Sequence, residues 1–269
     1  MMILSLGAGV QSTTLALLAK HRILPRPRAA VFADTGNEPK AVYTHLNWLE
    51  GVLDYLVIRA SYGNLGEDCL QLKYSEKNDR VYQNIRVPMF TLAADGKKGM
   101  MPRQCTRAYK IDMVNAACRR LLKKRQIRAT EGILVHCWIG ISTDEAHRMK
   151  PSQVPWIRKE YPLIDLGMSR ADCIQWCADH GYPQPPRSGC TFCPYHSDEE
   201  WLRLRSEAPD EFQGVVEWER KMREQNLKSE AMTSDIFVHS QRVPLDQVIF
   251  KTGANEGQFG NECEGMCGA

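Results

Sequence analysis

The fold class is decided by the stretch Met2-Ile3-Leu4-Ser5-Leu6-Gly7-Ala8-Gly9-Val10-Gln11-Ser12-Thr13. Its first part, residues 2–6, is an apolar run that predicts a buried strand. Residues 12–21 follow after two glycines, and Leu15, Leu18 and Ala19 fall on one face at helical spacing. The stretch therefore predicts a strand, a glycine-containing turn and a helix.

The same alternation continues downstream. Apolar runs at residues 29–32 and 55–58 predict two further strands, and residues 39–48 between them have a helical period. A β-α-β-α-β order implies a parallel sheet with right-handed crossovers. We therefore expect an α/β fold with a doubly wound parallel sheet.

The rest of the chain extends this pattern. A strong helical stripe covers residues 106–124, and apolar runs at 133–139 and 161–164 predict two more strands. We expect a nucleotide-binding α/β domain over residues 1–168. Residues 169–269 should form a helical, cysteine-rich C-terminal region that packs on it.

Composition limits the functional classes. The formal charge is +3, so any case for nucleic-acid binding must come from local clusters. The sequence has no apolar run of 18 residues and no signal-peptide pattern, so we expect a cytoplasmic protein without a membrane partner. Ten cysteines are then expected to be thiols, metal ligands or catalytic groups.

The glycine turn after the first strand is a candidate phosphate loop. Amides at a helix N-terminus lack partners, the helix dipole favours anions there, and Gly7 and Gly9 permit close backbone approach. The sequence has neither a Walker lysine nor a Gly-x-Gly-x-x-Gly fingerprint, so an ordinary glycine turn is the alternative. The candidate nucleotide-binding residues here are Ser5, Gly7, Ala8, Gly9, Gln11, Ser12 and Thr13.

The cysteines fall into two groups. Cys190-Thr191-Phe192-Cys193 has the spacing that lets two thiolates face one metal, and Cys105 precedes a helix. A helix N-terminus and nearby arginines would lower a thiol pKa. Zinc and a [4Fe–4S] cluster both accept thiolates, so the pattern leaves both open. Structural positions are expected for Cys118, Cys137, Cys173 and Cys177, and Cys69 is not assigned.

Six cations are concentrated near the end of the helix at 106–124: Arg119, Arg120, Lys123, Lys124, Arg125 and Arg128. Such a group can follow a phosphate backbone. The alternative is a solvated helix face, with cations favoured near a helix C-terminus. Trp138, Trp156 and Trp201 are scattered, so the sequence predicts no base-stacking platform.

Two further segments carry a family resemblance. The second predicted strand ends in Asp34-Thr35-Gly36, and Gly140-Ile141-Ser142-Thr143-Asp144-Glu145-Ala146-His147-Arg148 follows a later strand. Together with the first loop, they resemble the PP-loop ATP pyrophosphatases (adenine nucleotide alpha hydrolase-like). Within these the match is to the phosphoadenosine phosphosulfate reductase-like branch, near the DNA phosphorothioation ATPases. Gln11 stands where the pyrophosphatases have aspartate, as in the sulfonucleotide reductases.

The resemblance implies a nucleotide site and roles for its residues. It adds Asp34, Thr35, Gly140 and Ser142 to the residues that bind ATP or a related adenine nucleotide. Gln11 and Arg148 would be catalytic, with Arg148 giving charge-assisted hydrogen bonds to phosphate. Asp144 or Glu145 would hold Mg²⁺ through oxygen ligands, and a solvated helix start is the alternative for this segment.

The resemblance also favours iron–sulfur over zinc. It implies metal ligation by Cys105, Cys190, Cys193 and Cys263, with Cys267 as a catalytic sulfur carrier. The reverse assignment of the two tail cysteines stays open, and so does a three-cysteine cluster with an open iron. Glu262-Cys263 is similar to the nucleophile segment of the reductases.

Three functions follow as expectations. The first is ATP-dependent sulfur transfer: adenylation of a nucleic-acid substrate (DNA or tRNA) with pyrophosphate release, then thiolation, with a cysteine desulfurase or other sulfur donor as partner. The second is a sulfonucleotide reductase with a C-terminal cysteine nucleophile. The third is a zinc-stabilised nucleic-acid-binding module without catalysis. A homo-oligomer remains open.

Overall fold

The computed structural model describes residues 1–251, so Cys263 and Cys267 lie outside the described residues. These residues form two compact units that interleave along the chain. The sheet unit comprises residues 1–62 and 106–189. The second unit comprises residues 63–105 and 190–251.

The sheet unit is built on five strands that all run parallel. In spatial order they are β3 (Leu56–Ser61), β2 (Ala29–Asp34), β1 (Met2–Leu6), β8 (Val135–Trp138) and β9 (Ile157–Glu160). The chain winds outward from β1 to β3 and later resumes on the other side of β1. A parallel sheet of this order has its switch point between β1 and β8, where ligands bind at the carboxyl ends of strands. The predicted α/β class with a parallel sheet is confirmed.

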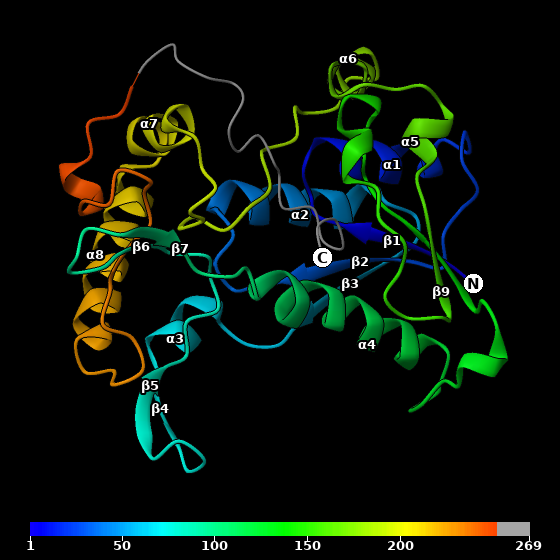
Figure 1. Ribbon diagram of the computed structural model, residues 1–269. Coiled ribbons are helices and arrows are strands. Elements are labelled where there is room, and N and C mark those ends of the chain that lie inside the picture. The colour runs from blue at the N-terminus through cyan, green and yellow to red at the C-terminus, as the bar shows by residue number, and fades with distance from the viewer. Residues whose placement is uncertain (252–269) are drawn as a thin grey trace. The chain divides into compact units, whose positions relative to one another are not determined.

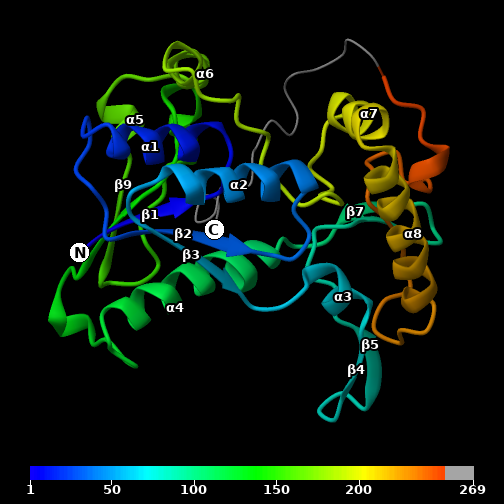
Figure 2. The same cartoon turned by 180° about the vertical axis from the view of Figure 1, so that it is seen from behind.

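Helices cover both faces of this sheet. Figures 1 and 2 show α1 (Val10–Lys20) and α2 (Lys40–Val52) on one side and α4 (Asp112–Leu121) on the other. On the α1 side, α5 (Pro162–Asp165) and α6 (Arg170–Asp179) complete the layer. The arrangement is the one expected for a doubly wound fold.

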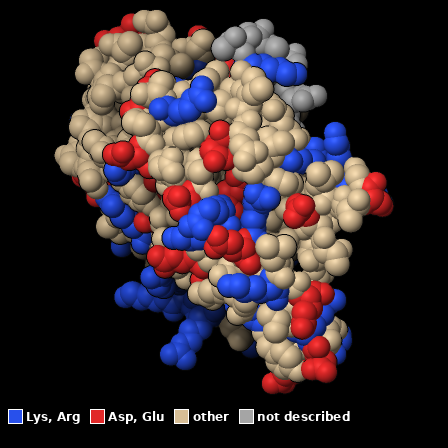
Figure 3. Space-filling model, turned by 90° about the vertical axis from the view of Figure 1, so that its left-hand side faces the viewer, with Lys and Arg blue, Asp and Glu red and all other residues tan. Residues whose placement is uncertain are grey.

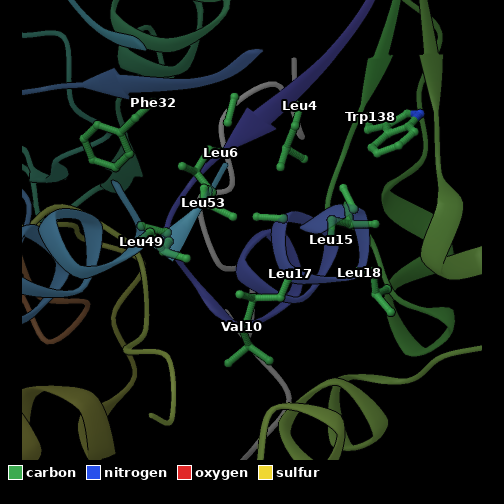
Figure 4. Close-up of a cluster of buried hydrophobic side chains, with 14 of the residues drawn as sticks. Leu4, Leu6, Val10, Leu15, Leu17, Leu18, Phe32, Leu49, Leu53 and Trp138 are labelled. Atoms are coloured by element: carbon green, nitrogen blue, oxygen red, sulfur yellow. The ribbon is translucent and has the colours of Figure 1, made fainter. Parts of the chain in front are cut away.

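The first helix is buried nearly all round. Ten of the eleven residues of α1 are buried, because the sheet lies on one side and α6 on the other. Figure 4 shows Leu15, Leu17 and Leu18 of this helix among side chains of β1, with Trp138 nearby. Burial of each such leucine contributes about 1.5–3 kcal/mol relative to exposure. This packing fixes where the N-terminus of α1 lies.

A second core lies under the opposite face of the sheet. Val114 and Cys118 of α4 pack there against Ile3 and Cys137. Burial raises the pKa of the Cys118 thiol to about 12 and that of Cys137 well above its usual range. Cys173 and Cys177 are buried in the first core. The structural positions expected for these four cysteines are confirmed.

The second unit is mixed. Its antiparallel sheet has the order β10 (Asp235–Phe237), β6 (Phe90–Leu92), β7 (Lys98–Met100). A separate hairpin joins β4 (Leu72–Ser75) to β5 (Arg80–Gln83). Its helices are α3 (Leu65–Leu70), α7 (Asp198–Glu207), α8 (Pro209–Asn226) and the 3₁₀ turn η4 (Leu245–Gln247). Residues 63–105 supply α3 and the strands β4 to β7 of this unit.

Two local predictions differ from the structure. The strand expected at residues 161–164 is wrong, because the strand is β9 and Pro162 begins α5. Proline suits the first turn of a helix and cannot donate in a sheet ladder. The helix expected at 106–124 begins with a π-helical turn, η1 (Thr106–Ile111), before α4.

The expected domain boundary after residue 168 also differs from the two units. Helix α6, which lies beyond it, shares a core with α1, and Thr14 Oγ1 donates to the carbonyl of Cys173 at 3.4 Å. Residues 63–105, which lie before it, group with residues 190–251. Within residues 1–251, no helix has the length and apolar character needed to cross a membrane.

Candidate nucleotide-binding site

The turn between β1 and α1 leaves the start of the helix uncapped. Gly9 is the N-cap residue and no side chain accepts from the first-turn amides. The first helical bond runs from the amide of Thr13 to the carbonyl of Gly9 at 3.0 Å, so the amides before it have no intrahelical partner. Ala8 has a φ of +57°, a strained conformation for a residue with a Cβ. The turn is therefore held in a specific shape with its amides available to an anion.

Hydroxyl groups brace this turn from inside. Ser12 Oγ accepts from the amide of Gly7 at 3.2 Å and donates to the carbonyl of Gly9 at 3.4 Å. Thr13 Oγ1 lies 3.0 Å from Nε2 of the buried His45. Burial lowers the pKa of His45 to about 4, so this ring is neutral at pH 7. Ser12 and Thr13 thus shape the loop, and the amides of residues 10–12 at the start of α1 have no intrahelical partner.

Gln11 is the centre of a polar network. Its amide Nε2 donates to Ser142 Oγ at 3.3 Å and to Glu145 Oε2 at 3.1 Å. Arg170 Nη1 donates to Gln11 Oε1 at 3.2 Å, and Arg148 Nη1 bonds Glu145 Oε1 at 2.6 Å. Gln11 is fully buried and Arg148 is 9% exposed. We call these five residues the Gln11 network.

The network joins distant segments at the carboxyl end of the sheet. Ser142 is fully buried and precedes the 3₁₀ segment η3 (Thr143–Arg148), which follows β8 and carries the acidic and basic partners. Arg170 is the first residue of α6 and bonds the oxygen of the Gln11 amide, opposite the nitrogen that bonds Ser142 and Glu145. Of the predicted site residues, Gln11, Ser142 and Arg148 are thus brought together. Gly140 lies between β8 and Ser142 in the chain and is buried.

The charge balance explains the amide at position 11. A carboxylate there would face Glu145, and like charges in contact disfavour their ionised forms. The neutral amide instead donates to the acid and accepts from the base, so both ionised partners are satisfied. Asp144 Oδ1 accepts from the backbone amide of Arg170 at 3.1 Å, which holds the start of α6 beside η3.

The end of β2 forms a separate braced turn. Asp34 Oδ1 accepts from the amide of Gly36 at 2.8 Å and from the hydroxyl of Tyr43 at 2.7 Å. Gly36 has a φ of +73°, which this turn requires and glycine adopts without strain. Burial and Asp34 hold the pKa of Tyr43 well above its ordinary value. Asp34 therefore orders the turn that follows β2.

A buried ion pair lies beside this turn and was not predicted. Lys110 Nζ of η1 lies 3.5 Å from Glu38 Oε1, with side chains 7% and 2% exposed. Thr35 Oγ1 also donates to Glu38 Oε1, at 3.2 Å. Buried ion pairs are costly to desolvate, and π-helical turns are frequent at functional sites. The helical pattern of residues 106–124 gave no sign that this lysine would point inward.

Arg170 was also missed, although the sequence held a signal. The capping box of Ser169 puts this arginine in the first turn of α6, where the helix dipole disfavours a cation. Such a placement calls for an acceptor or anion nearby. Gln11 Oε1 supplies one acceptor.

The cysteine site is only partly described. None of the eight cysteines within residues 1–251 forms a disulfide bond. Cys190 and Cys193 lie on one turn, in which the amide of Cys193 donates to the carbonyl of Cys190 at 3.0 Å, and Cys105 belongs to the same unit. No group of three or more His, Cys, Asp or Glu side chains among the described residues is placed to hold a metal.

Comparison with protein-family models and with characterised proteins finds no match for this chain.

Proposed function

We propose that the protein binds ATP at the β1–α1 turn and uses it for sulfur transfer to a nucleic acid. The uncapped α1 N-terminus, set beside Arg148 and Arg170 at the switch point of a parallel sheet, carries this proposal. Amides at a helix start and two guanidinium groups suit the phosphates of a nucleotide. Ser5, Asp34 and Thr35 come from the same edge of the sheet.

The reaction would proceed in two displacements. A substrate oxygen attacks the α-phosphorus, a new O–P bond forms, and the bond to the leaving pyrophosphate breaks. A sulfur nucleophile then attacks the activated carbon or phosphorus, and AMP leaves with the oxygen. The loop amides would hold the phosphates, Arg148 and Arg170 would stabilise the developing charge, and Gln11 would keep both arginines oriented.

Two groups would assist these residues. Mg²⁺ would neutralise the triphosphate, with Asp144, an exposed carboxylate of η3, as its protein ligand. The Cys190–Cys193 turn fits thiolate ligation, and Cys105, Cys190, Cys193 and Cys263 would hold a [4Fe–4S] cluster or zinc. A cluster would supply a site for sulfide or electrons. Cys267 is proposed as the persulfide carrier: its outer sulfur would attack the activated atom, and a reducing thiol would then cleave the S–S bond and release the thiolated product.

A sulfonucleotide reductase is the second candidate. It is favoured by the neutral amide of Gln11, which bonds Glu145 on one side and Arg170 on the other where the pyrophosphatases have a carboxylate. A neutral group there suits an anionic substrate that is held without cleavage of its α–β bond. In that reaction a tail thiolate attacks the sulfate sulfur, the S–O bond to the nucleotide breaks, and reducing thiols release sulfite. Sulfite release from a sulfonucleotide, without pyrophosphate release from ATP, would favour it over sulfur transfer.

The test begins with protein purified anaerobically. ATP binding is measured by calorimetry and pyrophosphate release by a coupled assay, with and without oligonucleotide and sulfur donor. Arg170→Gln should weaken ATP binding about 10- to 100-fold, because a charged hydrogen bond contributes roughly 1.5–3 kcal/mol. Arg203→Gln, an exposed position of α7, is the matched control. Unchanged ATP affinity in Arg170→Gln, or no nucleotide binding by the wild type, would remove the proposal.

A further inference from the structure

The C-terminal end of α4 is a concentrated source of positive charge. Within ten residues, the last turn of α4 and the segment that follows it carry six cations: Arg119, Arg120, Lys123, Lys124, Arg125 and Arg128. Lys124 forms an ion pair with Glu131, whereas the other five form no ion pair with any residue from 1 to 251. Four of these five are exposed, and Arg119 is partly buried.

A second group of cations adjoins this end of α4. Lys150, Arg158 and Lys159 line a shallow hollow of about 690 Å³ together with the exposed Ile133. Leu121, the last residue of α4, and Leu122 after it pack in the same hydrophobic cluster as Ile127, Leu134 and Val154. The amide of Leu134 donates to the carbonyl of Trp156 at 3.0 Å, and Ile133 lines the hollow with residues of the second group, so the two segments adjoin on the sheet unit. We call residues 119–134 and 149–159 the basic face.

The basic face is strongly positive, whereas the rest of the chain has a net negative charge. It contains nine Lys and Arg and one carboxylate, that of Glu131, a formal charge of +8. Elsewhere the chain has 26 basic and 31 acidic residues, a formal charge of −5. Figure 3 shows a different face, which belongs to the second unit, and over its centre Lys and Arg are mixed with Asp and Glu. Like charges gathered in this way repel one another, and binding of a polyanion relieves that repulsion.

We propose that the basic face binds the sugar–phosphate backbone of a nucleic acid strand. Its cations are lysines and arginines on a helix end and an edge strand, which fit a row of phosphates and carry no base readout. The described residues of the face include no exposed aromatic ring for base stacking: Trp156 is buried and Tyr161, next to the face, binds Lys150 through its hydroxyl. Binding is therefore independent of sequence.

The geometry sets a minimum length for the strand. Helix α4 runs from the carboxyl edge of the sheet back to its amino edge, because it connects η1 to β8, which is parallel to β1. With η1 it spans sixteen residues, or about 24 Å. That distance corresponds to about seven nucleotides of a helical strand. A strand that reaches from the nucleotide site to the basic face is thus longer than about seven nucleotides.

That the bound strand is the substrate rests on the proposed function, whereas its binding to the basic face does not. Binding is measured without ATP, by fluorescence anisotropy of labelled 6-mers and 20-mers of single-stranded DNA, duplex DNA and RNA, across a salt series. The test variant is Arg120→Gln/Lys123→Gln/Arg125→Gln. The control is Arg203→Gln/Lys221→Gln/Lys228→Gln, which removes three exposed cations of the second unit.

We expect the wild type to bind a 20-mer with a steep dependence on salt. Loss of three phosphate contacts lowers the slope of log K against log salt by about 2 for a single strand and about 2.7 for a duplex. The test variant should bind at least about tenfold more weakly, whereas the control keeps wild-type affinity. The three DNA and RNA probes show which strand is preferred. Thermal melts of both variants should match the wild type, since every changed side chain is exposed.

Three results would overturn the proposal. They are equal weakening by test and control variants, wild-type affinity in the test variant, and binding of anionic phospholipid vesicles in place of all three nucleic acids. Salt-dependent binding that needs the basic face, without pyrophosphate release, would support nucleic-acid binding by this face and exclude the sulfur-transfer function. Pyrophosphate release without salt-dependent binding would support the proposed function and exclude nucleic-acid binding by the basic face.

Discussion

Substitution of Gln11 by glutamate tests the network most directly. The two side chains have nearly the same shape, so Gln11→Glu replaces only the amide nitrogen that donates to Glu145 Oε2 at 3.1 Å. The variant would place two carboxylate oxygens at that separation in a site where Gln11 is fully buried. One hydrogen bond becomes a repulsion, and the rest of the fold stays as it is.

The magnitude follows from the distance. Two unit charges about 3 Å apart repel by roughly 5 kcal/mol at an effective dielectric constant of about 20. Arg148 and Arg170 remain in the network and offset part of this, so we expect a net loss of about 2–3 kcal/mol at pH 7.5. The pair avoids the repulsion by keeping one proton, which raises the pKa of that carboxyl group above its value in the unfolded chain.

The sign of the pH dependence is fixed by that shift. When a carboxyl pKa is higher in the folded state, the folded protein binds more protons than the unfolded chain, so stability falls as pH rises. Gln11→Glu should therefore approach wild-type stability near pH 4.5 and lose stability progressively toward pH 7.5. Urea denaturation at several pH values measures the difference from wild type.

The control is Gln11→Met, which removes the hydrogen bonds without adding charge. Its destabilisation should not depend on pH relative to wild type. Both variants should bind ATP more weakly at pH 7.5, because Arg148 and Arg170 lose their orientation. A Gln11→Glu protein that is as stable as wild type at pH 7.5 would refute the network as described.

Three further predictions use other contacts. Because burial lowers the pKa of His45 to about 4, the folded protein resists protonation, and up to about 3 kcal/mol of stability should be lost as pH falls from 6.5 to 4. His45→Gln should reduce that loss in urea denaturation, and an unchanged pH profile would contradict it. Lys110→Met removes the cation that lies 3.5 Å from Glu38 Oε1 and should lower the free energy of unfolding by about 3–5 kcal/mol. The double variant Lys110→Met/Glu38→Gln should recover much of that loss. Equal losses in the single and double variants would contradict the ion pair. Cys190→Ser should abolish any absorption near 400 nm or bound zinc in anaerobically purified protein, and persistence of the metal would exclude this residue as a ligand.

Local patterns predicted much of the architecture. The strand at residues 2–6 was predicted with its observed bounds, because a buried parallel strand is apolar on both faces. The capping boxes that begin α6 and α7 at Ser169 and Ser197 are likewise local, since the cap and its partner are three residues apart. The error at residues 161–164 has the same origin, because a short apolar run suits a strand or a buried helical turn equally well.

The candidate site was predicted only in part. Gln11, Ser142 and Arg148 were identified by resemblance, and the structure brings them together. Arg170 and the Glu38–Lys110 pair were missed, because nothing in their own segments shows what they contact. The metal ligands and the sulfur carrier remain predictions.

The sequence by itself determined that this chain would fold around a parallel sheet with a glycine-containing turn before α1, because hydrophobic period and turn residues act over a few positions. Only the tertiary structure decided what surrounds that turn. Gln11 meets Ser142, Glu145 and Arg170 across 131, 134 and 159 positions of sequence. The order of strands about β1 and the packing of α6 on α1 bring them together, since contacts at such separations depend on how whole elements are arranged.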